Sequence, residues 1–330
     1  MPTVQTVLGP VDPADLGRVL PHEHVFSLLP SLWMGDAVDA AAVAVEAVKS
    51  QGIGTVVDLS PYGVVGRDPD GGNVVGLVEL SRRTGMHVVA GTAVYLEAFA
   101  PAWALKASLD ELTARLVRDL TVGIGDTAVR AGILGEQATG LGAMTAFEER
   151  AFRASLRAHR ETGAALMTHT THGTLAHDQV DMAMAEGADL DRVVIGHVDT
   201  QLDVDLARSL IDRGVLVAVD TIGKQVWDFF LGPAGGDRAE GEFGKQAFFR
   251  ADAARADMVA ALAAAGYADR VVLAHDLTGA ETWMNPATHG VYGYRYLGDV
   301  FVPMLLERGV TADDVEQMVA RTPARLLAVA

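Results

Sequence analysis

Short apolar, β-branched runs alternate with amphipathic stretches along almost the whole chain. Eight of these runs have the length and composition of buried strands, and turn residues bound them. They span residues 18–24, 54–60, 87–95, 131–136, 164–169, 192–197, 215–220 and 270–276. Eight strands joined by crossover helices predict an α/β fold, the (β/α)8 TIM barrel, formed by one domain over residues 1–330. A doubly wound sheet is the alternative, but "PHEHVF" stands where its Gly-rich phosphate turn would follow the first strand.

Signals for helix starts and long loops lie between the predicted strands. Two segments, 221–250 and 277–296, are long for connections that follow a strand, so we expect them to shape a substrate pocket. Capping-box pairs mark three helix starts: Ser108 with Glu111, Thr145 with Glu148, and Thr311 with Asp314.

The composition narrows the chemistry and the partners. Cysteine is absent, so any metal must be held by histidine and carboxylates, which favours Zn first and otherwise Mn, Co or Fe. The net charge of −17 argues against nucleic acid and anionic membranes as partners. We find neither a membrane span nor a signal peptide. We therefore expect a cytoplasmic protein, a homodimer, that acts on a small-molecule substrate.

Histidines and carboxylates stand where the predicted strands end. In an extended backbone His22 and His24 point to the same face, because alternate residues of a strand share a face. The carboxyl ends of barrel strands meet at one mouth, so side chains at these ends should converge there. The residues concerned are His22 and His24 in the first strand, Glu136 in the fourth, His169 in the fifth, His197 in the sixth and Asp276 in the eighth.

Four imidazoles and two carboxylates suit a pair of divalent cations that share one water, whose pKa both ions lower. In this hypothesis Asp276 also accepts the proton of that water as the reaction proceeds. His275 points to the other side of its strand and is expected to pack. The ligand set is His22, His24 and Asp276 for one ion, His169 and His197 for the other, with Glu136 as the bridge.

The ordered pattern "HEH…E…THT…IGH…AHD" resembles the binuclear metal centre of the amidohydrolase superfamily. Stretches such as "VVDLSPYGVVGRD", "RAGILGEQATG" and "VVIGHVDT" resemble its phosphotriesterase-related, lactonase-like branch. The better-known members of that branch carry a carboxylated lysine as the bridge. Here "GILGEQ" offers Glu136 one residue later, which is similar to a glutamate-bridged subgroup. The resemblance implies a metal-dependent hydrolase.

Within this family the leading hypothesis is hydrolysis of a lactone or a related carboxylic ester. Tyr95 falls where lactonase-like relatives place a tyrosine near the metals, and we assign it to catalysis with Asp276. Lys224, Tyr292 and Arg295, in the two long loops, are candidates for binding an anionic tail of the substrate. The alternatives are an organophosphate triester hydrolase, an N-acyl amide hydrolase, and a barrel without catalysis that keeps a metal for structure.

Overall fold

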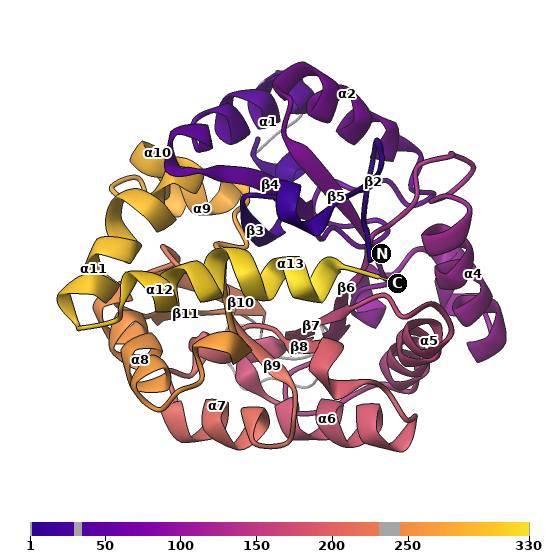
Figure 1. The fold of residues 1–330 in the computed structure, drawn as a ribbon. Helices are drawn as coiled ribbons and strands as arrows, with labels where there is room; N and C mark the ends of the chain where they lie inside the picture. The colour runs from indigo at the N-terminus through magenta and orange to yellow at the C-terminus, as the bar shows by residue number, and fades with distance from the viewer. Residues whose placement is uncertain (1, 30–34, 231–244, 330) are drawn as a thin grey trace.

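Eight parallel strands form the centre of the molecule (Figure 1), as the sequence predicts. The computed structural model describes residues 2–29, 35–230 and 245–329. The strands are hydrogen-bonded in the order β12-β9-β8-β7-β6-β5-β4-β3. The backbone N–H of Asp276 donates to His22 O at 3.1 Å, which brings the last strand against the first and closes the barrel. Their bounds are β3 (Arg18–Glu23), β4 (Ile53–Asp58), β5 (His87–Thr92), β6 (Ile133–Thr139), β7 (Leu166–Thr170), β8 (Val193–Ile195), β9 (Leu216–Val219) and β12 (Val271–Leu273).

Helices surround the barrel (Figure 1), and the three predicted capping boxes are confirmed at the starts of α4, α5 and α12. None of the helices in the described residues has the length and apolar character that a membrane span requires. Their bounds are α1 (Ala37–Glu46), α2 (Val75–Thr84), α3 (Ala102–Lys106), α4 (Leu109–Thr121), α5 (Ala146–Thr162), α6 (Ala176–Ala185), α7 (Val204–Ile211), α8 (Asp252–Ala264), α9 (Gly279–Met284), α10 (His289–Tyr292), α11 (Val302–Glu307), α12 (Ala312–Glu316) and α13 (Thr322–Leu327).

Alternation along each strand separates two apolar cores. Val57 belongs to the cluster inside the barrel, while its neighbour Val56 packs outward with the helices. The hairpin of β1 (Val4–Thr6) and β2 (Gly9–Val11) lies with α13 at the amino-terminal end of the strands, which we call the base. Val4 and Leu326 join the inner cluster from there. Apolar side chains therefore fill the base of the barrel. We call the opposite end, where the carboxyl ends of the strands meet, the mouth; polar side chains gather there.

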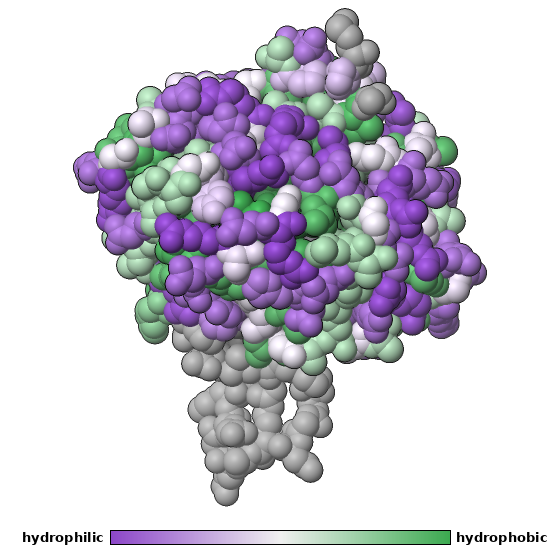
Figure 2. Space-filling model, turned by 60° about the horizontal axis from the view of Figure 1, so that its bottom comes forward, coloured by the Kyte–Doolittle hydropathy of each residue, from purple (hydrophilic) through white to green (hydrophobic). Residues whose placement is uncertain are grey.

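Several predicted strand ends are wrong. β8 ends at Ile195 and β12 ends at Leu273, so His197 and Asp276 lie beyond them. Both residues have a positive φ, 57° and 52°, which is outside the strand region. The first long segment contains the antiparallel pair β10 (Val226–Phe230) and β11 (Lys245–Phe249), and the second contains α9 and α10. The part of the first segment over 231–244 lies outside the described residues. On the face drawn in Figure 2, hydrophilic side chains predominate around small apolar areas.

Candidate metal centre

The six residues predicted as ligands converge at the mouth, and all are buried. Glu136 lies at the centre of the group. Its Oε1 is 2.7 Å from both His169 Nδ1 and His197 Nε2, while its Oε2 faces His24 Nε2 at 3.8 Å. Asp276 Oδ1 lies 2.9 Å from His24 Nε2 on the far side of the group. Side chains from five strands or the residues just after them thus form one cluster, although Glu136 lies within β6 and does not end it as the sequence analysis predicts.

Two sets of donor atoms in this cluster are close enough to hold a cation. Each set gathers its ligand atoms within 4.8 Å: His22 with Glu136 and His197, and His22 with His24 and Asp276. His22 thus falls in both sets, whereas the sequence hypothesis groups it with His24 and Asp276 alone. His169 lies in neither set, although its Nδ1 contacts the same oxygen of Glu136 as His197 does.

The ring nitrogens that face the carboxylates show that these residues fit a metal. The Nε2 atoms of His22 and His24 are buried against carboxylate oxygens: His24 Nε2 lies 2.9 Å from Asp276 Oδ1, and His22 Nε2 lies 3.6 Å from Glu136 Oε1. The Nδ1 atom of His22 contacts Asp220 at 2.8 Å, and that of His24 contacts Ser60 Oγ at 3.1 Å. If Nδ1 carries the proton, Nε2 presents a lone pair to the cluster, which is what a divalent cation requires.

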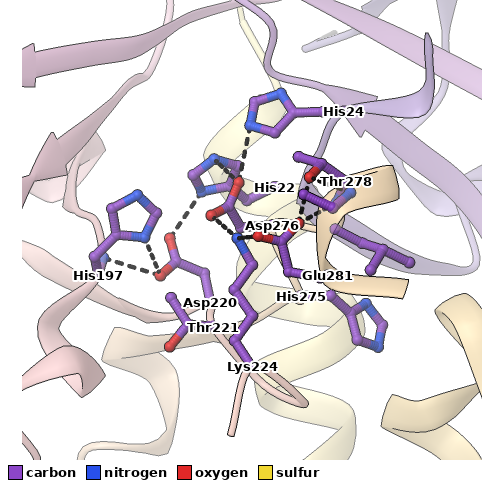
Figure 3. Close-up of polar contacts among 12 residues, drawn as sticks. His22, His24, His197, Asp220, Thr221, Lys224, His275, Asp276, Thr278 and Glu281 are labelled. Carbon is purple, nitrogen blue, oxygen red and sulfur yellow. Dashed lines mark hydrogen bonds and ion pairs between the residues drawn. The ribbon is translucent and has the colours of Figure 1, made fainter. Parts of the chain in front are cut away.

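Asp220, directly after β9, is a site residue that the sequence analysis missed. Its Oδ2 accepts from His22 Nδ1 at 2.8 Å, and its Oδ1 accepts from His197 Nδ1 at 2.9 Å (Figure 3). One carboxylate therefore orients an imidazole from the first strand and another from the sixth. The sequence does carry a signal for it, because Asp220 follows an apolar run as several of the predicted ligands do.

Glu23, between the two ligand histidines, faces away from the cluster. Its Oε1 contacts His275 Nδ1 at 2.7 Å and accepts from His275 N at 3.1 Å, and its Oε2 accepts from Leu277 N at 3.1 Å. His275 therefore packs outside the ligand set, as predicted, and Figure 3 shows its ring pointing away from the group. Glu23 joins the first strand end to the last.

The remaining predicted residues lie around the cluster. The Tyr95 hydroxyl is 3.1 Å from His169 Nδ1. Lys224 is buried, and its Nζ donates to Asp276 Oδ2 (Figure 3). Arg295 pairs with Asp299 at 3.3 Å, and its guanidinium lies 5.9 Å from the centre of the Tyr292 ring. The assignment of Lys224, Tyr292 and Arg295 to substrate binding stays a prediction.

The electrostatics of the cluster favour ionised carboxylates. Burial raises the pKa of Asp220, but the imidazoles of His197 and His22 outweigh it and lower the value to about 2. Burial is likewise outweighed at Glu136, where His169 and His22 bring the pKa well below its usual range. At Asp276 the Lys224 ammonium has the same effect against burial and lowers the pKa. These groups are therefore charged at neutral pH, as metal ligands must be.

A barrel mouth that buries imidazoles beside ionised carboxylates is suited to divalent cations. The model of the phosphotriesterase family matches residues 2–327, so this fold and site define a metal-dependent hydrolase. The chain belongs to the phosphotriesterase family.

Three relatives illustrate the range of this family. The "phosphotriesterase homology protein" of Escherichia coli K12 is 33% identical over 255 residues, 77% of this chain and 79% of that protein. Its structure, described as complexed with phosphate in the active site, has a TM-score of 0.79 at 30% identity and covers 95% of this chain and 99% of that one. A mutant of the PTE-like lactonase of Deinococcus radiodurans has a TM-score of 0.81 at 30% identity, covering 98% and 99%. The N-acetyltaurine hydrolase of Danio rerio is 25% identical over 361 residues, 98% of this chain and 97% of that protein.

Proposed function

We propose that the protein is a binuclear hydrolase of lactones or related carboxylic esters, that it uses two divalent cations, Zn first, and that Glu136 is their bridge. One observation carries the proposal. The two oxygens of Glu136 face opposite sides of the cluster, Oε1 toward His169 and His197 and Oε2 toward His24. A carboxylate in this position supplies one oxygen to each of two ions, as a carboxylated lysine would, without needing carbon dioxide.

The bound cations would polarise the scissile carbonyl and lower the pKa of a shared water. The residues of the chain prepare the rest of the reaction. Asp276, ionised and in contact with His24, accepts the proton of the attacking water and returns it to the leaving oxygen. Asp220 holds the rings of His22 and His197 in place. Tyr95, beside His169, donates its hydroxyl to a substrate oxygen.

One observation favours a lactone over a phosphotriester: Tyr95 rather than a tryptophan follows β5 and lies against the cluster. The relatives support both, because structures from Deinococcus radiodurans are described as a PTE-like lactonase at 30% identity and as an organophosphorus hydrolase at 31% identity. A second candidate is hydrolysis of an N-acyl amide, which the Danio rerio N-acetyltaurine hydrolase supports. Both reactions attack an sp² carbonyl carbon, so the same cluster serves either.

The test is a substrate panel on protein that has been stripped of metal and reloaded with Zn, Mn, Co or Fe. Elemental analysis should give two ions per chain, and bicarbonate should not affect recovery of activity. Lactones should exceed paraoxon-like triesters in kcat/KM by at least about tenfold, roughly 1.4 kcal/mol in transition-state binding. A panel in which amides exceed the lactones would select the second candidate. Two bound ions without turnover of any substrate would indicate a barrel that keeps metal for structure.

The role of Arg295 has its own control. Arg295→Ala should raise KM for anionic substrates and spare neutral ones, because in this proposal the Arg295 cation, in the second long segment, orients a distant charge of the substrate. Arg321→Ala should change neither, since Arg321 lies between α12 and α13, near the base. Equal effects of Arg295→Ala on anionic and neutral substrates would remove Arg295 from substrate binding.

A further inference from the structure

The two oxygens of Asp276 have different partners. Oδ1 faces the imidazoles, 2.9 Å from His24 Nε2 and 3.7 Å from His22 Nε2. Oδ2 instead accepts from Lys224 Nζ, as Figure 3 shows. A carboxylate can rotate about its last bond and offer either oxygen or both to a cation. The lysine therefore distinguishes two oxygens that are otherwise equivalent.

Lys224 is itself held at both ends. Its ammonium lies 3.7 Å from Glu281 Oε1, and both side chains are buried. The other oxygen of Glu281 accepts from Thr278 N at 2.9 Å and caps α9, so Glu281 is fixed by its own helix. On the backbone, Lys224 O accepts from the buried Arg255 Nη2 at 3.1 Å. A buried ammonium is costly unless it is paired, and here two carboxylates pair it.

We propose that Lys224, held in place by Glu281, is a positioning residue that keeps Asp276 turned so that Oδ1 alone faces the metal centre. The inference rests on the proposed function, in which Asp276 is a ligand and a proton acceptor. It gives the segment after β9 and helix α9 a part in the reaction, since one carries Lys224 and the other Glu281. A carboxylate freed from the lysine would turn and offer both oxygens to one ion, leaving neither well placed for the proton.

The experiment compares Lys224→Met, Lys224→Arg and Glu281→Gln with wild-type holoenzyme loaded with cobalt. Lys224→Met should keep two cobalt ions per chain but change the visible absorption of the bound cobalt, which reports its coordination. On the best ester substrate, kcat should fall about 10- to 100-fold, as is usual when a partner behind a metal ligand is removed. KM should stay within about threefold. Glu281→Gln should act in the same direction with a smaller effect, and Lys224→Arg should recover part of kcat.

Lys106→Met is the matched control, because Lys106 is exposed on α3, and it should leave absorption and kcat unchanged. Wild-type absorption and kcat in both Lys224→Met and Glu281→Gln would overturn the proposal. So would a loss of activity that follows only a lower folded fraction, with unchanged absorption of the folded protein. If Lys224→Met does not fold, Glu281→Gln decides alone. The absorption of bound cobalt needs no substrate, so failure of the ester assignment would leave this comparison readable.

Discussion

The turns at the two ends of the barrel differ in which residues adopt left-handed backbone. At the base, turns that lead from a helix into a strand use glycine, as at Gly85 before β5 and Gly163 before β7. At the mouth, glycines such as Gly63 and Gly223 take this conformation too, but so do residues that carry a side chain. In the described part of the chain they are Val65, His172, Leu175, His197, Leu202 and Asp276, and all follow barrel strands.

Left-handed backbone costs an L-residue of order 1–3 kcal/mol, whereas glycine adopts it readily. The base therefore has relaxed turns, and the mouth keeps strain at two of its proposed ligands, His197 and Asp276. Strain persists where the surrounding structure requires a particular side-chain direction. This difference indicates that the two ends of the barrel are specialised: the base contributes to stability, and the mouth holds residues for the reaction.

Asp276→Asn tests this division most strongly. The amide keeps a coordinating oxygen but loses the proton acceptor, so kcat of metal-loaded protein should fall about 10²–10⁴-fold. Asparagine tolerates left-handed backbone at least as well as aspartate, but it leaves the buried Lys224 ammonium with Glu281 as its remaining carboxylate partner, so the melting temperature of the metal-free protein should fall. Asp269→Asn, in the exposed turn at the base end of the same strand, should leave kcat near wild type. Near wild-type kcat in metal-replete Asp276→Asn would remove Asp276 from the mechanism.

Asp220→Ala should weaken metal binding about 10- to 100-fold, because His22 and His197 both lose the carboxylate that orients them. Titration of metal-free protein with zinc and a competing chelator measures this. Asp212→Ala, at the base end of the same strand, is exposed and should bind zinc as wild type does. Similar affinities in the two variants would mean that the ends of β9 do not differ as proposed.

Tyr62, in the segment after β4, makes stability at the mouth sensitive to alkali. Burial and the nearby Asp119 carboxylate raise its pKa to about 12. The folded state thus keeps a proton that the unfolded chain releases near pH 10, so this contribution is complete below pH 10 and is lost as pH rises toward 12. The expected loss by pH 11 is about 1 kcal/mol. Urea unfolding at pH 9 and pH 11 should show a smaller drop for Tyr62→Phe; equal drops would refute the assignment.

Gly85→Ala should lower the free energy of unfolding by about 1 kcal/mol. The added Cβ would meet no atom within 4 Å, so the cost comes from the φ of 68° alone. Enzyme activity per folded molecule should not change. Urea unfolding measures the loss, and a neutral result would mean that the turn at the base adapts to a side chain.

Val65→Gly should raise the free energy of unfolding, and its effect should be the smallest of those predicted. Val65 is β-branched with a φ of 42°, so glycine relieves strain, while the unfolded chain gains entropy. We expect a net stabilisation of about 0.5 kcal/mol. Val64→Gly, next to it and without a positive φ, should destabilise instead. If both substitutions destabilise equally, strain at the mouth is not stored at this residue.

Much of the fold could be predicted because the eight buried strands read as continuous apolar runs with turn signals around them. The ends of the strands could not be predicted from the sequence. His197 and Asp276 lie beyond β8 and β12 and have left-handed backbone, and no sequence signal marks such a conformation at His or Asp. The hairpin of β10 and β11 also escaped prediction, because it lies in a Gly-rich segment.

The convergence of the candidate site could be predicted from position alone, because parallel strands bring their carboxyl ends to one mouth. The supports of the site needed the structure. Asp220 and Glu23 have the same residue types as ligands, and only their hydrogen bonds show that they orient other groups. The sequence predicts that Lys224 binds the substrate, whereas in the structure its ammonium contacts Asp276.

The contact of Glu23 with His275 also bears on how the protein is made. These residues are 252 positions apart, and they join the first strand end to the last. A ribosome adds about 5–20 residues per second, so His22 and His24 are exposed for many seconds before Asp276 is synthesised. The pair of histidines alone offers a cation two ligands. The complete ligand set forms only when the last strand docks against the first. The contact of Glu23 with His275 then holds the last strand in place. Full metal loading therefore reports that the whole barrel has been synthesised and folded.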